Sequence, residues 1–161
     1  MRILGIDPGI ARVGWAVIET HTPEPAAVSF GCITTEKDEK AEVRLRQIHD
    51  AVGLLCKKFR PDCMSVEDLF FATNATTAIG VGQSRGVILL AAAEGHIPVV
   101  SYSPPAVKRT ITGDGRADKK QVISMVIRIL KLKKAPLLDD TADALAIAMT
   151  HAYSYRMKQL V

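Results

Sequence analysis

Aromatic residues and long apolar stretches are both scarce in this chain. Only 5% of its 161 residues are Phe, Trp or Tyr. The longest unbroken apolar run, Val87 to Ala93, is far shorter than the roughly 20 residues that a transmembrane helix requires. The apolar run that follows Met1 is also short and ends at Asp7. We therefore expect no membrane span, no signal peptide and a location in the cytoplasm.

Cysteine is scarce as well. The three cysteines, Cys32, Cys56 and Cys63, are an odd number, and no two of them form a Cys-x-x-C pair. This spacing is not typical of a zinc site or of a disulfide framework, so we expect reduced thiols. The four histidines are scattered along the chain, and they predict no His/Cys metal centre either.

The overall composition is that of an ordinary globular protein, with 48% hydrophobic and 24% charged residues. The length predicts one domain over residues 1–161 with room for a sizeable core. Lys and Arg number 21 against 17 Asp and Glu, a net charge of +4. That excess permits a polyanionic partner without requiring one.

The hydrophobic pattern predicts an α/β protein. Short β-branched runs separated by turns predict an antiparallel meander over residues 2–6, 13–18 and 28–34. Apolar residues then recur three and four apart, which predicts a helix over 41–59. Further strands are expected over 63–66 and 97–102, and further helices over 74–94, 118–132 and 140–155. This order favours a mixed sheet with helices on both faces.

Acidic residues follow two of the expected strands. Asp7 stands at the end of the first strand and Glu67 at the end of the strand over 63–66. An Asp before Pro-Gly is by itself typical of a turn. A strand-end carboxylate is also where α/β sheets bind ligands, and an unpaired buried Glu is costly. Both interpretations stay open for each residue taken alone.

Three more acids, Asp139, Asp140 and Asp143, open the last expected helix. The helix dipole favours acids in a first turn, and Asp139 is a candidate N-cap. However, Asp140 and Asp143 are three residues apart and share a face that continues into apolar residues. Four carboxylates that converge would repel one another unless a hard divalent cation such as Mg²⁺ or Mn²⁺ neutralised them.

An ordered series of segments is similar to the RuvC family of bacterial Holliday junction resolvases. The similarity runs from residue 3 to about residue 151. Its segments are ILGIDPG (3–9), GWAVI (14–18), SVEDLF (65–70), GQSRGV (82–87), VKRT (107–110), Gly113 with KKQV (119–122), and DTADALAIA (140–148). Each segment alone is a weak signal, but the ordered set is specific.

This resemblance implies an RNase H-like fold with a mixed five-stranded sheet, three antiparallel strands followed by parallel ones. It implies a homodimeric endonuclease that cuts four-way DNA junctions with two Mg²⁺ or Mn²⁺ ions per site, and that works with the RuvA and RuvB branch-migration complex. The catalytic and metal-binding positions of the family fall on Asp7, Glu67, Asp140 and Asp143. The choice of Asp140 over Asp139 depends on its spacing from Asp143.

The resemblance also assigns DNA contacts. Lys108 and Lys119 match phosphate-binding positions of the family, although lysines are more often solvated surface residues. Phe70 matches an aromatic residue that stacks on an unpaired base, whereas the simpler interpretation places Phe70 and Phe71 in the core. The helix over 74–94 is rich in Gly and Ala, which indicates close packing on its own sheet or, as in the family, a dimer interface.

Other classes of protein remain open at this point. Another RNase H-like nuclease, acting on RNA–DNA hybrids or other branched DNA, would share the same acids. An actin-like ATP-binding protein would share the turn at 5–9, but that class is normally far longer. A junction-binding module without catalysis is the third alternative, and the complete set of acids argues against it.

Overall fold

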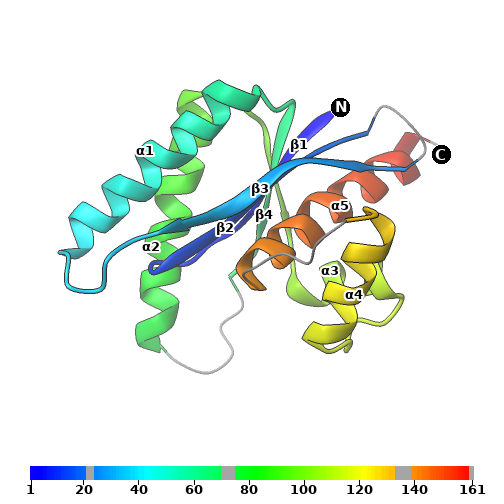
Figure 1. The fold of residues 1–161 in the computed structure, drawn as a ribbon. Helices are drawn as coiled ribbons and strands as arrows, with labels where there is room; N and C mark the ends of the chain where they lie inside the picture. Colours follow the sequence, from blue (N-terminus) through cyan, green and yellow to red (C-terminus); the bar gives the residue numbers. More distant parts are fainter. Residues whose placement is uncertain (21–23, 70–74, 133–138, 160–161) are drawn as a thin grey trace.

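The computed structural model describes residues 1–20, 24–69, 75–132 and 139–159 (Figure 1). Its sheet has the strand order β3-β2-β1-β4-β5. The strands are β1 (Arg2–Asp7), β2 (Arg12–Glu19), β3 (Ala26–Thr34), β4 (Cys63–Glu67) and β5 (Val99–Tyr102). β1, β2 and β3 pair antiparallel, while β4 and β5 join β1 as parallel strands. The five-stranded mixed sheet expected from the sequence is therefore confirmed.

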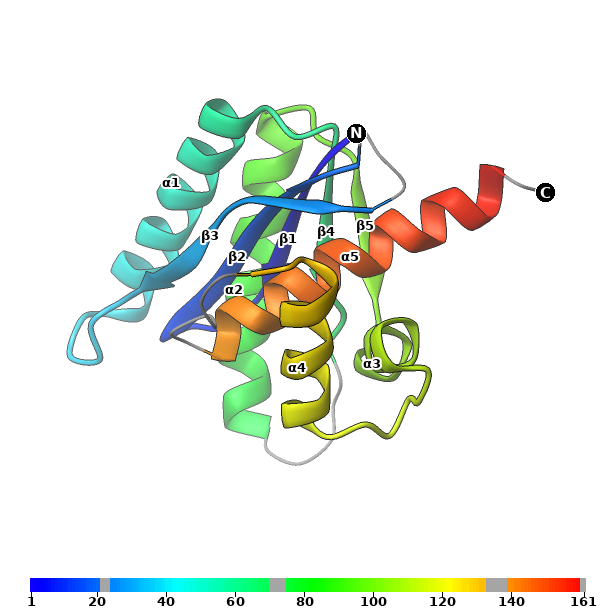
Figure 2. The same ribbon diagram turned by 45° about the vertical axis from the view of Figure 1, so that its right-hand side comes forward.

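Helices cover both faces of the sheet, as Figures 1 and 2 show. One face carries α1 (Ala41–Phe59) and α2 (Ala75–Glu94), which pack on each other and on β1, β2 and β4. The other face carries α5 (Asp139–Gln159), with α3 (Pro104–Thr112) and α4 (Lys119–Ile129) beside it. Within the described residues, no helix is long and apolar enough to cross a membrane.

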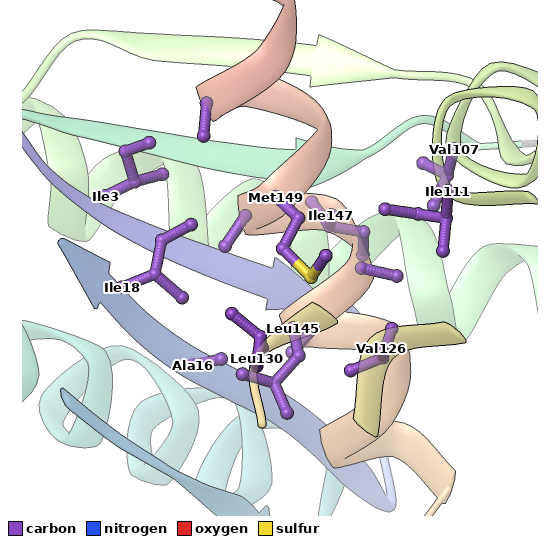
Figure 3. Close-up of a cluster of buried hydrophobic side chains, with 14 of the residues drawn as sticks. Ile3, Ala16, Ile18, Val107, Ile111, Val126, Leu130, Leu145, Ile147 and Met149 are labelled. Carbon is purple, nitrogen blue, oxygen red and sulfur yellow. The ribbon is translucent and has the colours of Figure 1, made fainter. Parts of the chain in front are cut away.

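The hydrophobic core beneath α5 determines the position of the first turn of that helix. In Figure 3, Ile147 and Met149 of α5 point among side chains of β1, β2, α3 and α4. The face of α5 predicted to be buried is buried, including Ala144, Ile147 and Ala148. This packing fixes the start of α5 beside the carboxyl ends of β1 and β4.

Several boundaries differ from those expected. Residues 104–112 form a helix, α3, for which Pro104-Pro105 is the only sign in the sequence. Val107 and Ile111 are buried on its inner face, and the helix ends at Gly113, which has a φ of 84°. β3 begins two residues earlier than predicted, at Ala26. α5 begins at Asp139, so that residue is not the N-cap. Asp118 caps α4, and Gln121 completes a capping box with it.

The three cysteines are free thiols, as expected. Cys56 and Cys63 are buried in the two cores, and burial raises the pKa of both thiols, to about 11 for Cys63. They are apolar packing residues rather than reactive groups.

Candidate active site

Two parallel strands bring the first two acids together. Asp7 is the last residue of β1 and Glu67 is the last residue of β4. The β1–β4 register pairs Ile6 with Val66, which places the two acids side by side just beyond the paired residues. Both side chains lie on the face of the sheet that α5 covers. Side chains alternate along a strand, and Asp7 is on the same face as Ile3, while Glu67 is on the same face as Cys63; Ile3 and Cys63 both belong to the core beneath α5.

Two glycines let α5 reach this edge. A Cβ on Gly14, the partner of Asp7 in β2, would overlap with the Asp140 carbonyl oxygen. A Cβ on Gly5 would overlap with the Ala144 carbonyl oxygen and with Ala148. Only glycine permits so close an approach of a helix to a strand. As a result, the first turn of α5 lies directly against the end of β1.

The surroundings of Asp7 and Glu67 disfavour their negative charge. Burial raises the pKa of Asp7 to about 8, and the nearby charges of Glu67, Asp143 and Asp140 add to the rise. Burial likewise raises the pKa of Glu67 to about 7, again with help from Asp143. Shifts of this kind are typical of functional sites, where carboxylates converge in a partly desolvated place.

The structure separates the two candidates for the third acid. The Asp139 side chain is 67% exposed and is not among the main causes of the raised pKa of Asp7 or Glu67, whereas the Asp140 side chain is 22% exposed and acts electrostatically on Asp7. Asp143 lies one turn further along α5, with its pKa raised by burial despite the Lys119 ammonium beside it. Asp140 and Asp143, rather than Asp139, therefore face the two strand-end acids.

A small hollow holds basic residues next to these acids. It has a volume of about 220 Å³ and is lined by Glu67, Asp143, Lys108 and Lys119, among others. Lys119 Nζ lies 2.9 Å from Asp143 Oδ2 and 3.6 Å from Asp139 Oδ2. Burial lowers the pKa of Lys119, but its hydrogen bond to Asp143 and the charges of Asp143 and its neighbours outweigh that and raise it. α3 and α4 thus supply two cations to one acidic site.

The donor set fits hard divalent cations. It consists of carboxylate oxygens, the ligands that Mg²⁺ and Mn²⁺ prefer. Asp140 Oδ2 is buried and accepts no hydrogen bond from the described residues, although Arg12 Nε lies 3.0 Å away. Among those residues, no three acidic, Cys or His side chains are yet close enough together to hold an ion. Asp7, Glu67, Asp140 and Asp143 are the residues that would hold such an ion, and Lys119 lies beside them on Asp143.

Phe70, predicted to contact DNA, and Phe71 lie outside the described residues. Three other basic residues close in sequence to Lys108 and Lys119 are exposed: Arg109 on α3, Arg116 between the helices and Lys120 on α4. Lys120 lines a different hollow from Lys119. Lys108 and Lys119 are therefore the two predicted cations that line the acidic hollow.

Three polar residues at this edge of the sheet were not predicted to be functional. Arg12 of β2 pairs with Asp140, and Ser84 and Arg85 of α2 bind the backbone near Asp7 and Glu67. For Ser84 and Arg85, the only signal in the sequence was the GQSRGV segment (82–87), which resembles the family but predicted no role for these two residues. Arg12 gave no signal, since the contact that identifies it joins residues far apart in the chain.

The small residues of α2 do not all serve packing within the chain. A Cβ on Gly86 would meet nothing within 4 Å, so the prediction that α2 packs closely on its own sheet is wrong for that residue. Ile79 and Leu90 lie on the same side of the helix and are 63% and 52% exposed. An apolar helix face left in solvent is typical of an interaction surface.

Comparison with protein families gives one match over most of the chain. The family model described as crossover junction endodeoxyribonuclease RuvC matches residues 3–151. A protein of that name from Brevibacillus brevis is 51% identical over 152 residues, covering 94% of this chain and 92% of the relative. Another from Thermotoga petrophila is 48% identical over 160 residues, covering 99% and 97%.

Solved structures agree with the sequence comparison. Thermus thermophilus RuvC superposes with a TM-score of 0.90 at 39% identity, covering 98% of this chain and 97% of that one. The same protein in complex with a Holliday junction substrate gives a TM-score of 0.93 at 39% identity, covering 98% and 96%. The yeast mitochondrial Holliday junction resolvase, at 17% identity, has a TM-score of 0.65 with 99% and 84% covered, and shares the fold.

Proposed function

This chain belongs to the RuvC family of crossover junction endodeoxyribonucleases, and we propose that it resolves four-way DNA junctions by paired symmetric nicks. The family is metal-dependent, and the proposal assigns two Mg²⁺ or Mn²⁺ ions to each site. One observation carries it. Asp7, Glu67, Asp140 and Asp143 come from three separate elements and interact electrostatically at one edge of the sheet, beside Lys108 and Lys119.

The four acids hold the ions in this proposal. Asp7 interacts electrostatically with the other three acids, so it would serve both ions, while Glu67 would hold one of them and Asp140 and Asp143 the other. When bound, two divalent ions activate a water molecule and stabilise the attacking and leaving oxygens of a phosphodiester. Bound cations also favour the ionised form of Asp7 and Glu67, whose pKa burial raises.

The lysines place the DNA backbone. Lys108 and Lys119 present ammonium groups at the rim of the acidic hollow, where a scissile phosphate has to enter. Lys119 pairs with Asp143, and in this proposal its ammonium would be available to a phosphate when the acids hold the ions. Phe70 follows Glu67 by three residues, and the proposal keeps it as the aromatic that stacks on an unpaired base at the junction.

The active unit in this proposal is a homodimer of one nuclease domain, spanning residues 1–161. The exposed apolar face of α2 is the surface through which two copies associate. A two-fold dimer presents two sites to a two-fold junction, which accounts for paired nicks. The protein acts in the cytoplasm in DNA recombination and repair, following branch migration by RuvA and RuvB.

A direct test uses four labelled substrates: a four-way junction, a linear duplex of the same sequence, another branched DNA and an RNA–DNA hybrid. Each is incubated with the protein in EDTA, in Mg²⁺ and in Mn²⁺. We expect symmetric cuts confined to the junction and dependent on the metal. Cleavage of the hybrid, or of the other branched DNA in preference to the junction, would assign the chain to another RNase H-like activity.

A further inference from the structure

The segment over 82–87 lies on α2, behind the ends of β1 and β4, and takes no direct part in the proposed chemistry. Arg85 is the only charged residue of this helix before Glu94. Ser84 and Arg85 both turn toward the sheet, while Gln83 and Gly86 are exposed to solvent. A polar pair on the inner side of an apolar helix requires partners, and both residues find them at the active-site edge.

Ser84 holds the turn that follows Asp7. Its side chain is fully buried, and its hydroxyl donates a hydrogen bond of 2.9 Å to the Gly9 carbonyl oxygen. The turn at Gly9 is tight, because a Cβ there would overlap with the Arg12 carbonyl oxygen. Ser84 therefore fixes the chain two residues beyond the Asp7 carboxylate.

Arg85 holds the end of β4. Its Nε donates to the Glu67 carbonyl oxygen at 3.3 Å, and its Nη2 donates to Asp68 Oδ1 at 3.1 Å and to Ser101 Oγ at 2.7 Å. The side chain is 19% exposed. A guanidinium can direct several donors at once from one rigid plane, so Arg85 joins the ends of β4 and β5 at the position of Glu67.

These contacts matter because the sheet does not tie the two acids to each other. Asp7 pairs with Gly14 in β2 and Glu67 pairs with Tyr102 in β5, whereas the β1–β4 pairs end one residue earlier. The negative charges of Asp7 and Glu67 repel each other, which favours separation of the two strand ends. Adjacent residues of one helix oppose that separation, one bound to each strand end.

We propose that Ser84 and Arg85 are positioning residues that set the spacing between Asp7 and Glu67 for metal binding. The inference rests on the proposed function, since it concerns the same site. Neither side chain touches an ion or DNA in this scheme; each acts through the backbone that carries a ligand. Groups of this kind affect metal affinity or activity by about 10–100-fold.

The test compares Arg85→Met, Arg85→Lys and Ser84→Ala with the wild-type protein. Mn²⁺ binding to the protein alone is measured by calorimetry, and single-turnover junction cleavage is measured against Mg²⁺ concentration. We expect Arg85→Met to weaken Mn²⁺ binding and raise the Mg²⁺ requirement by about 10–100-fold, with junction affinity unchanged. Arg85→Lys should be intermediate, because an ammonium carries its donors on a single nitrogen and cannot reach acceptors spread as widely as those that Nε and Nη2 of the guanidinium bind. Ser84→Ala should also weaken Mn²⁺ binding and raise the Mg²⁺ requirement.

Two controls separate positioning from stability and charge. Ile88→Val removes one buried methyl group from the same helix and lowers the stability by about 0.5–1.5 kcal/mol. Arg46→Met removes an arginine–aspartate pair from α1. Both controls should bind Mn²⁺ like the wild type. The inference is overturned if Arg85→Met also does so, or if Ile88→Val at equal thermal stability loses as much affinity.

The test of the positioning role gives a result that does not depend on whether the proposed function is correct. A wild-type protein that binds Mn²⁺ but cuts no junction would reject the proposed function. The Mn²⁺ affinities of the variants would still decide whether Ser84 and Arg85 position the acids.

Discussion

The Asp7 carboxyl group has to ionise to bind a metal ion, yet its surroundings favour the protonated form. The pKa of Asp7 is about 8 in the folded, metal-free protein because of burial and then of the neighbouring acids, against 3.8 for an ordinary Asp. Between these values the folded state holds a proton that the unfolded state has released. This group's contribution to stability is therefore complete at low pH and declines as the pH rises toward 8.

Asp7→Asn should raise the thermal stability, whereas most substitutions of partly buried residues lower it. In EDTA at pH 8 we expect the variant to melt at a higher temperature than the wild type, since the wild type loses up to about 1.4 kcal/mol per pH unit over that interval. Junction cleavage should fall to background while junction binding is retained. Thermal melts from pH 5 to 9, with and without Mg²⁺, and a binding assay in Ca²⁺ measure both effects. Normal cleavage by Asp7→Asn would exclude Asp7 from catalysis.

Lys119 should contribute one ionic contact with DNA. Lys119→Ala is expected to weaken junction binding for every sequence and to reduce the slope of log K against log salt by about one. Titrations at several salt concentrations measure this. Lys131→Ala is the matched control, since Lys131 follows the other end of the same helix and pairs with Glu24. An unchanged salt slope in Lys119→Ala would mean that this lysine does not bind phosphate.

Helix α5 depends on glycine in the strands beneath it. Gly14→Ala places a Cβ against the Asp140 carbonyl oxygen, so the first turn of α5 has to move. We expect a loss of about 1–3 kcal/mol in the free energy of unfolding, measured by urea titration, together with a lower cleavage rate.

Gly53→Ala provides the contrast to that substitution. A Cβ on Gly53 in α1 meets nothing within 4 Å, and a helix interior favours Ala over Gly by about 0.5–1 kcal/mol. This variant should be more stable than the wild type and equally active. If both substitutions have the same effect on stability and cleavage, close approach of α5 is not what Gly14 provides.

The elements also show how far sequence reasoning reaches. Strand ends after Ile6 and Val66 predicted where Asp7 and Glu67 would lie, because parallel strands end at one edge, and the spacing of Asp140 and Asp143 predicted a shared face. The helix over 104–112 was not predicted, since nine residues give too little periodicity. The roles of Arg12, Ser84 and Arg85 depend on contacts between residues far apart in the chain. The GQSRGV segment marked Ser84 and Arg85 without indicating those contacts, and Arg12 had no signal at all.

For the molecule as a whole, α2 has one face on the surface proposed for the dimer and the other against the candidate active site. Its exposed side carries Ile79, Gly86 and Leu90, and its inner side carries Ser84 and Arg85. In the proposed dimer, the second copy would therefore contact the same helix whose inner side binds the two strand ends.

Leu90→Glu should disrupt the proposed dimer, because it places a charge in an apolar contact. We expect a monomer by sedimentation at concentrations where the wild type is dimeric. On a supercoiled plasmid with an extruded cruciform, the wild type should give linear product from paired cuts, and the variant nicked circles. Val28→Glu is the control, since Val28 on β3 is similarly exposed, at 45%. A Leu90→Glu protein that stays dimeric, or a monomer that still linearises the plasmid, would exclude this helix as the source of paired cleavage.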